Sequence, residues 1–392
     1  MLASKKNALS LDDGAMTIES LRDLTSAETC STLVLKVGSS LLVDAKGQPR
    51  QEWLAGLVDE IAKMCALGQR IVVVSSGAIA LGAARLGLPK GGRASLADAQ
   101  AAASVGQIAL SGLWSSLLEQ RGLSAAQMLV TLGDLEERRR YLNASSTLSR
   151  LLEAGVVPVV NENDSVATEE IRFGDNDRLA ARVGQAAGAN AVILLSDVDG
   201  LMDRDPAEPG AQFVPIVRGV TDTIRAMAGA ISGSGMGSGG MVSKIQAAEI
   251  AERAGISLAI INGQNQCPIS RAVERNLGTI FVPTRQDGAK RAWLGGRIAP
   301  LGTLVVDEGC IAALAKGASL LAAGIVRVDG TFERSQLVTI ADSDGCAIAQ
   351  GLAEYDAETC VRLSGKRQSE QAEILGHAPR SAVVHRDHMV ML

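Results

Sequence analysis

The chain has 392 residues, 47% of them hydrophobic, so it is long enough for two domains and apolar enough for a packed core. Its formal net charge is −5 and only 2% of its residues are aromatic. Both values argue against nucleic-acid binding, which needs a basic surface and often aromatic stacking. No apolar run approaches roughly 18 residues, so no membrane-spanning helix is expected.

Residues 1–29 are polar, carry charges of both signs and lack the apolar middle of a signal peptide. They are predicted to form a mobile N-terminal extension. The chain has six cysteines and no CxxC pair, a pattern typical of reduced thiols in a cytoplasmic protein. These cysteines are Cys30, Cys65, Cys267, Cys310, Cys346 and Cys360.

Strands and helices alternate from residue 33 onward. Short apolar runs predict strands over residues 33–37, 71–74, 127–132, 156–160, 191–195 and 257–261. Apolar residues at helical spacing predict helices over residues 53–65, 96–120, 141–154, 177–188 and 241–254. Near-continuous apolar strands that alternate with helices are typical of a mostly parallel sheet sandwiched by helices. Residues 30–285 are therefore predicted to form an α/β domain.

The composition changes after Pro283. Residues 286–299 are polar and charged and are predicted to be a linker. Short strands are predicted over residues 303–306, 325–328, 336–340 and 347–349, with a single helical piece at 310–316. Residues 300–392 are therefore expected to form a small, mostly β domain that ends in a C-terminal tail.

Almost every strand of the first domain ends in a polar or glycine-rich turn: GSS, SSG, NEND, SDVDG or NG. The carboxyl ends of parallel strands meet at one edge of the sheet, so these turns predict a ligand-binding rim. The most informative stretch contains NEND at 161–164 and GDND at 174–177. Either cluster alone is as compatible with a surface turn as with a site, but together, directly before a helix, they favour a site.

A glycine-rich segment, residues 229–240, leads into the helix predicted from residue 241. It contains GxGxxG without a preceding strand, so a dinucleotide fingerprint is not supported, and the chain has no P-loop motif. Such a loop at a helix N-terminus suits phosphate, with a plain surface loop as the alternative. Lys244, in the first turn, opposes the helix dipole unless an anion lies there. Lys36 interrupts an apolar strand, where a structural ion pair is the alternative to a role at the site.

The expected rim has no histidine, because all three histidines lie after residue 376. The chain also has no GxSxG motif and no His/Cys metal set. These absences favour chemistry that needs no proton acceptor. Phosphoryl transfer to a carboxylate fits, because a carboxyl group with a pKa of about 4.3 is already an anionic nucleophile at neutral pH.

The ordered motifs resemble those of the glutamate 5-kinase family, within the amino acid kinase superfamily, in its longer form with a C-terminal PUA-type domain. The resemblance runs from about residue 31 to the end. The matching pieces are LVLKVGSSLL (33–42), VVVSSGAIALG (72–82), VGQ (105–107), VPVVNENDSVA (157–167), GDND (174–177), SDVDGL (196–201), GSGGMVSK (237–244) and VDEG (306–309).

This resemblance implies ATP-dependent phosphorylation of the side-chain carboxylate of L-glutamate to L-glutamyl 5-phosphate, the first step of proline biosynthesis. Mg²⁺ would be carried with the nucleotide, without a metal site on the protein. The family is inhibited by proline, which would act near the glutamate site. A cytoplasmic homo-oligomer, a dimer or a tetramer, is expected, with no membrane and no nucleic-acid partner.

The resemblance also implies roles for individual residues. Lys36 and Lys244 would stabilise the transferring phosphoryl group, and Asp177 would hold both lysines. Glutamate would be bound by Ser76, Asp164 and Asn176, assisted by Gly77, Asn161 and Asp175. The acid that takes the substrate ammonium is left open. The nucleotide would be contacted by Lys36, Gly38, Ser196, Asp197, Ser238, Gly239, Gly240, Met241, Val242, Ser243 and Lys244.

Two alternatives remain at this stage. One is a kinase for another acid, such as acetylglutamate or aspartate, which trapping of the acyl phosphate with hydroxylamine would distinguish. The other is an RNA-binding protein, because PUA-type domains often bind structured RNA. Tight, salt-sensitive binding of tRNA on a filter would favour that second alternative.

Overall fold

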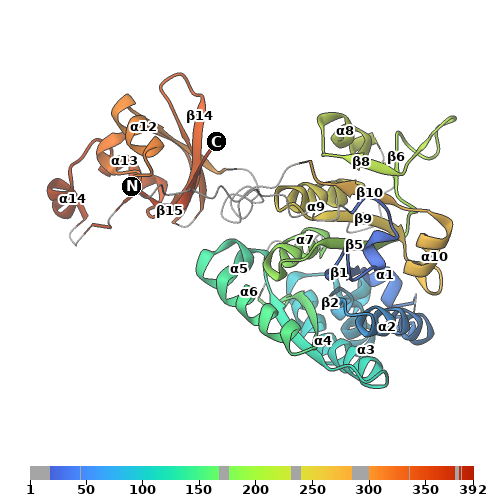
Figure 1. The fold of residues 1–392 in the computed structure, drawn as a ribbon. Coiled ribbons are helices and arrows are strands. Elements are labelled where there is room, and N and C mark those ends of the chain that lie inside the picture. Colours follow the sequence, from blue (N-terminus) through green and yellow to red (C-terminus); the bar gives the residue numbers. More distant parts are fainter. Residues whose placement is uncertain are drawn as a thin grey trace, which may run out of the picture.

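The computed structural model describes residues 18–44, 46–166, 176–230, 240–284, 300–334, 336–375, 379–380 and 382–392. Its two large sheets have eight and five strands (Figure 1). The eight-stranded sheet contains, in spatial order, β3 (Ala125–Val130), β4 (Val157–Glu162), β2 (Arg70–Ser75), β1 (Thr32–Val37), β5 (Ala191–Ser196), β9 (Ser257–Asn262), β10 (Thr279–Val282) and β8 (Ile216–Arg218). The strands from β3 to β9 in this order are parallel, whereas β10 is antiparallel to β9 and parallel to β8. This confirms the predicted mostly parallel sheet.

Helices cover both faces of this sheet (Figure 1). They are α1 (Ser39–Leu42), α2 (Gln51–Ala66), α3 (Ala78–Leu86), α4 (Leu96–Glu119), α5 (Leu132–Glu136), α6 (Arg138–Glu153), α7 (Asn176–Ala187), α8 (Asp222–Ala230), α9 (Met241–Arg253) and α10 (Pro268–Arg275). Successive residues of a strand point to opposite faces. Accordingly, Leu33 and Leu35 of β1 belong to the core cluster of α2, α4 and α10, and Val34 belongs to that of α6, α7 and α9. The same alternation directs Lys36 to the face covered by α7 and α9.

The start of the described chain packs onto the core. Ile18, Leu21 and Leu24 are buried in the cluster of α2 and α4, and residues Asp23–Thr25 form the short 3-10 helix η1. The side-chain amide of Gln69 donates hydrogen bonds to the carbonyl oxygens of Leu24 (2.9 Å) and Cys30 (2.7 Å). The prediction of a mobile extension is therefore wrong for residues 18–29, because three apolar side chains anchor them. Residues 1–17 lie outside the described part of the chain.

Helices α3 and α4 cross with their backbones in contact. A Cβ on Gly82 would lie 1.8 Å from the carbonyl oxygen of Ala102, and one on Gly106 would lie 1.7 Å from that of Ala78, so both positions require glycine. Among the described helices, α4 alone is long and apolar enough to cross a membrane, by length and composition only. One face of α4 packs against the protein, through the crossing with α3 and the buried side chain of Trp114.

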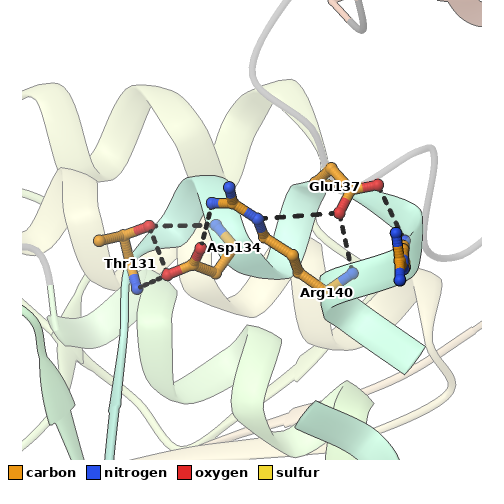
Figure 2. Close-up of polar contacts among 5 residues, drawn as sticks. Thr131, Asp134, Glu137 and Arg140 are labelled. Carbon is orange, nitrogen blue, oxygen red and sulfur yellow. Dashed lines mark hydrogen bonds and ion pairs between the residues drawn. The ribbon is translucent and has the colours of Figure 1, made fainter. Parts of the chain in front are cut away.

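The short helix α5 joins β3 to α6 in a tight connection (Figure 2). The Thr131 side chain accepts a hydrogen bond from the Asp134 N–H, and the Asp134 carboxylate accepts one from the Thr131 N–H, which is a capping box for α5. Glu137 caps α6 by accepting hydrogen bonds from the N–H groups of Arg139 and Arg140. The guanidinium of Arg140 also lies 2.7 Å from Asp134. These caps explain why the strand predicted over 127–132 ends at Val130.

The same turn is tied to α7 by an ion pair. Glu136 of α5 lies 3.5 Å from the guanidinium of Arg182, a residue of α7 that is only 1% exposed. A buried arginine needs such a partner, because the desolvation of its charge is otherwise uncompensated. The pair fixes α7, whose first residues carry site groups.

The second large sheet contains, in spatial order, β12 (Ile325–Gly330), β11 (Gly302–Val306), β13 (Leu337–Ala341), β14 (Ala347–Ala353) and β15 (Val384–Met391). Its helices are α12 (Glu308–Ala315), α13 (Ala357–Leu363) and α14 (Gln368–Leu375). The prediction of a single helical piece and a C-terminal tail is wrong. Asp356 caps α13 by accepting the Thr359 N–H, and the charged β15 is tolerated because it is an edge strand. The linker predicted over 286–299 lies outside the described residues, so the domain boundaries stay predictions.

Two strands of the first domain were also missed, β8 and β10, together with a two-stranded hairpin of β6 (Leu201–Met202) and β7 (Phe213–Val214). The hairpin lies between β5 and β8 in the chain. Thr279 of β10 holds it, because its hydroxyl accepts the Leu201 N–H and donates to the Val214 carbonyl oxygen. All of these strands have four residues or fewer, too short for a periodic pattern to stand out.

Candidate active site

Two lysines from distant parts of the chain meet one carboxylate. The Nζ of Lys36, near the end of β1, lies 2.6 Å from Oδ1 of Asp177, and the Nζ of Lys244, in the first turn of α9, lies 3.0 Å from Oδ2. All three side chains are at least nine-tenths buried. The structure thus brings together the three predicted catalytic residues at the carboxyl end of β1.

The two lysines hold the carboxyl group of Asp177 in its ionised state. Burial alone would raise the pKa of Asp177, but the positive charges of Lys36 and Lys244 outweigh it and hold this pKa below its usual value. Each carboxylate oxygen thus faces one ammonium group. Asp177 lies in the first turn of α7 and Lys244 in the first turn of α9, and the N-terminal end of a helix offers backbone N–H groups to a phosphate.

A chain of amide and hydroxyl groups lies beside these charges. The Asn176 Nδ2 donates to the Ser76 hydroxyl (2.5 Å) and to the Asn161 Oδ1 (3.3 Å). The Asn161 Nδ2 donates in turn to Oε1 of Gln107 (2.8 Å), which is on α4. The remaining acceptor, Asn176 Oδ1, is buried without a hydrogen-bond partner among the described residues. A ligand donor would satisfy it.

These groups border a hollow at the strand ends, which we call the strand-end hollow. Of the six residues predicted to bind substrate, five line it: Ser76, Gly77, Asn161, Asp164 and Asn176. Gly77 has a φ of 109°, and a Cβ there would approach the side chain of Leu42 to 3.0 Å, so the turn before α3 requires glycine. Asp175 lies outside the described residues.

Asp164 is an acid of the hollow whose pKa lies above its usual value. Its carboxyl group is partly withdrawn from water, and this burial raises its pKa to about 6, although the nearby charge of Arg93 acts in the opposite direction. A carboxyl group of this kind favours a cationic ligand group, because ion pairing restores the charge that burial disfavours.

The residues predicted to contact the nucleotide are spread along β1, β5 and α9. Gly38 lies beside Lys36, since a Cβ there would be 3.6 Å from the Lys36 Nζ. Ser196 ends β5 and donates a hydrogen bond to Asp197 (3.2 Å). Gly240 precedes α9 without a side-chain cap, and Met241, Val242, Ser243 and Lys244 form its first turn. Ser238 and Gly239 lie outside the described residues.

Sequence reasoning missed three residues of the site. Gln107 completes the amide chain, and Arg93 and Glu162 line the strand-end hollow. The VGQ motif contained Gln107, and NEND contained Glu162, so a signal existed for both. Among the described residues, no group of three or more His, Cys, Asp or Glu could hold a metal ion.

Comparison with known proteins agrees with this geometry. Residues 31–262 match the amino acid kinase family, and residues 302–375 match the PUA domain. The chain is 62% identical to the glutamate 5-kinase of Novosphingobium aromaticivorans, over 96% of this chain and 100% of that protein. The chain belongs to the glutamate 5-kinase family of amino acid kinases.

Other glutamate 5-kinases are similar over nearly the same length. Identity is 58% with the protein of Sphingopyxis alaskensis, over 93% of this chain and 98% of that protein. It is 53% with the protein of Zymomonas mobilis, over 93% of this chain and 92% of that protein. The predicted resemblance is confirmed: the chain is a kinase of this family, and its phosphoryl donor is ATP. None of these relatives bears the name of an acetylglutamate or an aspartate kinase.

Proposed function

We propose that the strand-end hollow binds L-glutamate and that Lys36 and Lys244 bind the phosphoryl group passing from ATP to its side-chain carboxylate. The observation that carries this proposal is the shared Asp177, which holds both ammonium groups within 3.0 Å of one carboxylate. Asn176, the preceding residue, lines the hollow. The cations and the acceptor pocket are therefore adjacent, as an in-line transfer requires.

The acceptor needs no base. A glutamate side-chain carboxylate is anionic at neutral pH, so one of its oxygens attacks the γ-phosphorus while the bond to the β-phosphate oxygen breaks. The leaving electron pair stays on ADP. Lys36 and Lys244 face the oxygens on which negative charge accumulates, and Asp177 keeps the two lysines in place in a site with little water.

Mg²⁺ is proposed to enter on the phosphates of the nucleotide, where it neutralises charge and orients the chain of phosphates. Asp197 and the Ser196 hydroxyl, at the carboxyl end of β5, are the oxygen groups that would face Mg²⁺ on the nucleotide. The first turn of α9, residues 241–244, offers backbone N–H groups to the phosphates.

The α-ammonium end of the acceptor is proposed to lie beside the side-chain amides of Asn176 and Asn161. Asn176 Oδ1 and the Asp164 carboxylate are acceptors, so they suit an ammonium group. This arrangement favours glutamate over acetylglutamate, whose nitrogen is an amide without charge. Aspartate would place its carboxylate about one methylene short of the two lysines.

The test is to trap the acyl phosphate with hydroxylamine in the presence of ATP and Mg²⁺. Glutamate should give the hydroxamate with a kcat/KM at least about 100-fold above that for acetylglutamate or aspartate, because a buried acceptor without its donor costs about 1–3 kcal/mol and misplacement adds to this. An equal yield from all three acids would contradict the assignment of the hollow.

Three further properties are proposed from the family. Proline should inhibit competitively with glutamate, because it offers the same ammonium and carboxylate to the hollow. The protein is expected to be a dimer or a tetramer, which light scattering would measure. A cytoplasmic location fits the six cysteines, all unpaired, of which Cys30 and Cys360 are buried.

A further inference from the structure

Arg93 is a charged residue of the strand-end hollow that lies outside the motifs quoted above. Among the described residues that line this hollow, Arg93 is the sole cation. Its guanidinium is exposed and makes no hydrogen bond or ion pair to the described residues, and its charge acts on the half-buried Asp164. The hollow therefore presents one cation, Arg93, beside the acid Asp164.

The backbone places Arg93 there by an unusual turn. In the 3-10 turn η2 (Pro89–Gly92), three successive residues have positive φ: Lys90 (51°), Gly91 (61°) and Gly92 (76°). A non-glycine residue is uncommon in this region, so the conformation of Lys90 marks the turn as unusual. The turn ends directly at Arg93.

Gly92 anchors this turn between two helices. It is buried, and a Cβ on it would lie 2.9 Å from the Cβ of Ala83 on α3 and 3.1 Å from that of Ala102 on α4. Ser95 then starts α4 by accepting the Asp98 N–H. Arg93 is thus fixed at both sides, between the crossing of α3 and α4 and the cap of α4, and its side chain reaches the hollow rather than moving with a free loop.

The end of glutamate that is not phosphorylated carries charges opposite to those of Asp164 and Arg93. Once its side-chain carboxylate lies at Lys36 and Lys244, glutamate carries an ammonium and a carboxylate at the opposite end. The amide chain and Asp164 supply acceptors for the ammonium. They supply no positive charge for the carboxylate, whose desolvation is costly without a charged partner.

We propose that Arg93 binds the α-carboxylate of the acceptor amino acid and makes a free α-carboxylate a requirement for good acceptors. The inference rests on the proposed function of the hollow. Arginine suits this task, because its planar guanidinium can donate two parallel hydrogen bonds to a carboxylate. Arg93 and Asp164 together would hold the zwitterionic end of the substrate in one orientation.

The experiment compares the full-length enzyme with its Arg93→Ala and Arg93→Lys variants in the hydroxamate assay. A lost hydrogen bond to a charged group should raise the glutamate KM about 10- to 100-fold in Arg93→Ala, with kcat and the ATP KM within about 2-fold. Arg93→Lys should recover part of the loss. Arg85→Ala is the matched control, because Arg85 is an exposed arginine of α3 outside the hollow, and its glutamate KM should not change.

A glutamate whose α-carboxylate is replaced by a carboxamide makes the test specific. Measured as a competitive inhibitor or acceptor, it should have the same affinity for the wild type and for Arg93→Ala, because the group that Arg93 binds is gone. An unchanged glutamate KM in Arg93→Ala, or an equal loss for both compounds, would overturn the inference. If the wild type made no hydroxamate from glutamate at all, the proposed function itself would fail.

Discussion

The two ends of the site handle charge differently. At the inner end, Lys36, Lys244 and Asp177 are buried and paired with one another, and the two ammonium groups and one carboxylate leave one positive charge. At the outer end, Asp164 and Arg93 line an open hollow, and their side chains form no hydrogen bond with the described residues. One end is complete before any ligand arrives, and the other is completed by the ligand.

The inner end should therefore contribute to the stabilisation of the transition state, and the outer end to the binding of the substrate. Groups that are already fixed can stabilise charge that develops only in the transition state, and so they act on turnover. Groups that lack partners until the substrate arrives gain their interactions on binding, so they act on the Michaelis constant. Substitutions at the two ends should therefore change different kinetic constants.

The largest effect is expected at the inner end. Lys244→Ala should lower kcat about 10²- to 10³-fold, the usual result of removing one donor to a developing anion, while the glutamate KM changes less than about 3-fold. Steady-state kinetics at saturating ATP measures both constants. A raised glutamate KM with unchanged kcat would place Lys244 in the acceptor pocket instead, and the difference between the two ends would disappear.

The amide chain depends on the α3–α4 crossing, so a change there should disturb the outer end first. Gly106→Ala would place a Cβ 1.7 Å from the Ala78 carbonyl oxygen and displace the neighbouring Gln107. We expect a loss of at least about 1–3 kcal/mol in the free energy of unfolding and a raised glutamate KM. Gly112→Ala is the control: nothing lies within 4 Å of its Cβ, so helix propensity should stabilise it by up to about 1 kcal/mol. If both variants unfolded at the same urea concentration, the close approach of the α3 and α4 backbones at Gly106 would be refuted.

A smaller effect is expected at Asp164. Asp164→Asn keeps the shape but removes the charge that faces the substrate ammonium, so the glutamate KM should rise about 10- to 30-fold at pH 7.5 with little change in kcat. Asp344→Asn, at an exposed aspartate of the second domain outside the hollow, serves as the control, and its glutamate KM should not change. If Asp164→Asn lowered kcat and left KM unchanged, the acid would belong with the inner end.

The sequence predicted the parts of this site that follow from strand order. Ser76, Asn161 and Asn176 directly follow or precede elements with clear apolar patterns, and the rule that parallel strands share a ligand edge brings them together. Lys36 was detectable because a charge interrupts an apolar run. Alternate residues of β1 point to opposite faces of the sheet, which directs Lys36 toward α7 and α9. Asp177 and Lys244 lie in the first turns of these two helices, so the three side chains meet.

The remaining parts depend on features without a local signal. The contact between Gln107 and Asn161 joins residues 54 positions apart and requires two helices to touch through glycines. The position of Arg93 requires three successive positive φ values, of which one falls on a lysine. The burial of Ile18 and Leu24 depends on a surface that the rest of the chain builds. Tertiary packing decides each of these features, so single-sequence patterns did not reveal them.

The smallest effect concerns pH and follows from the raised pKa of Asp164, about 6 in the free protein. An acid with a raised pKa loses its charge as the pH falls through that value, and the neutral form no longer attracts the substrate ammonium. The other charged residues of the hollow, Arg93 and Glu162, face the same ligand. The glutamate KM should therefore be constant above about pH 7, rise about 2-fold at pH 6 and about 11-fold at pH 5, as the fraction of ionised Asp164 falls. The kcat should follow a different profile, because the pKa of Asp177 is held below its usual value. Measured between pH 5 and 8, Asp164→Asn should give a flat KM profile, and a profile that keeps its rise below pH 6 would show that another group titrates.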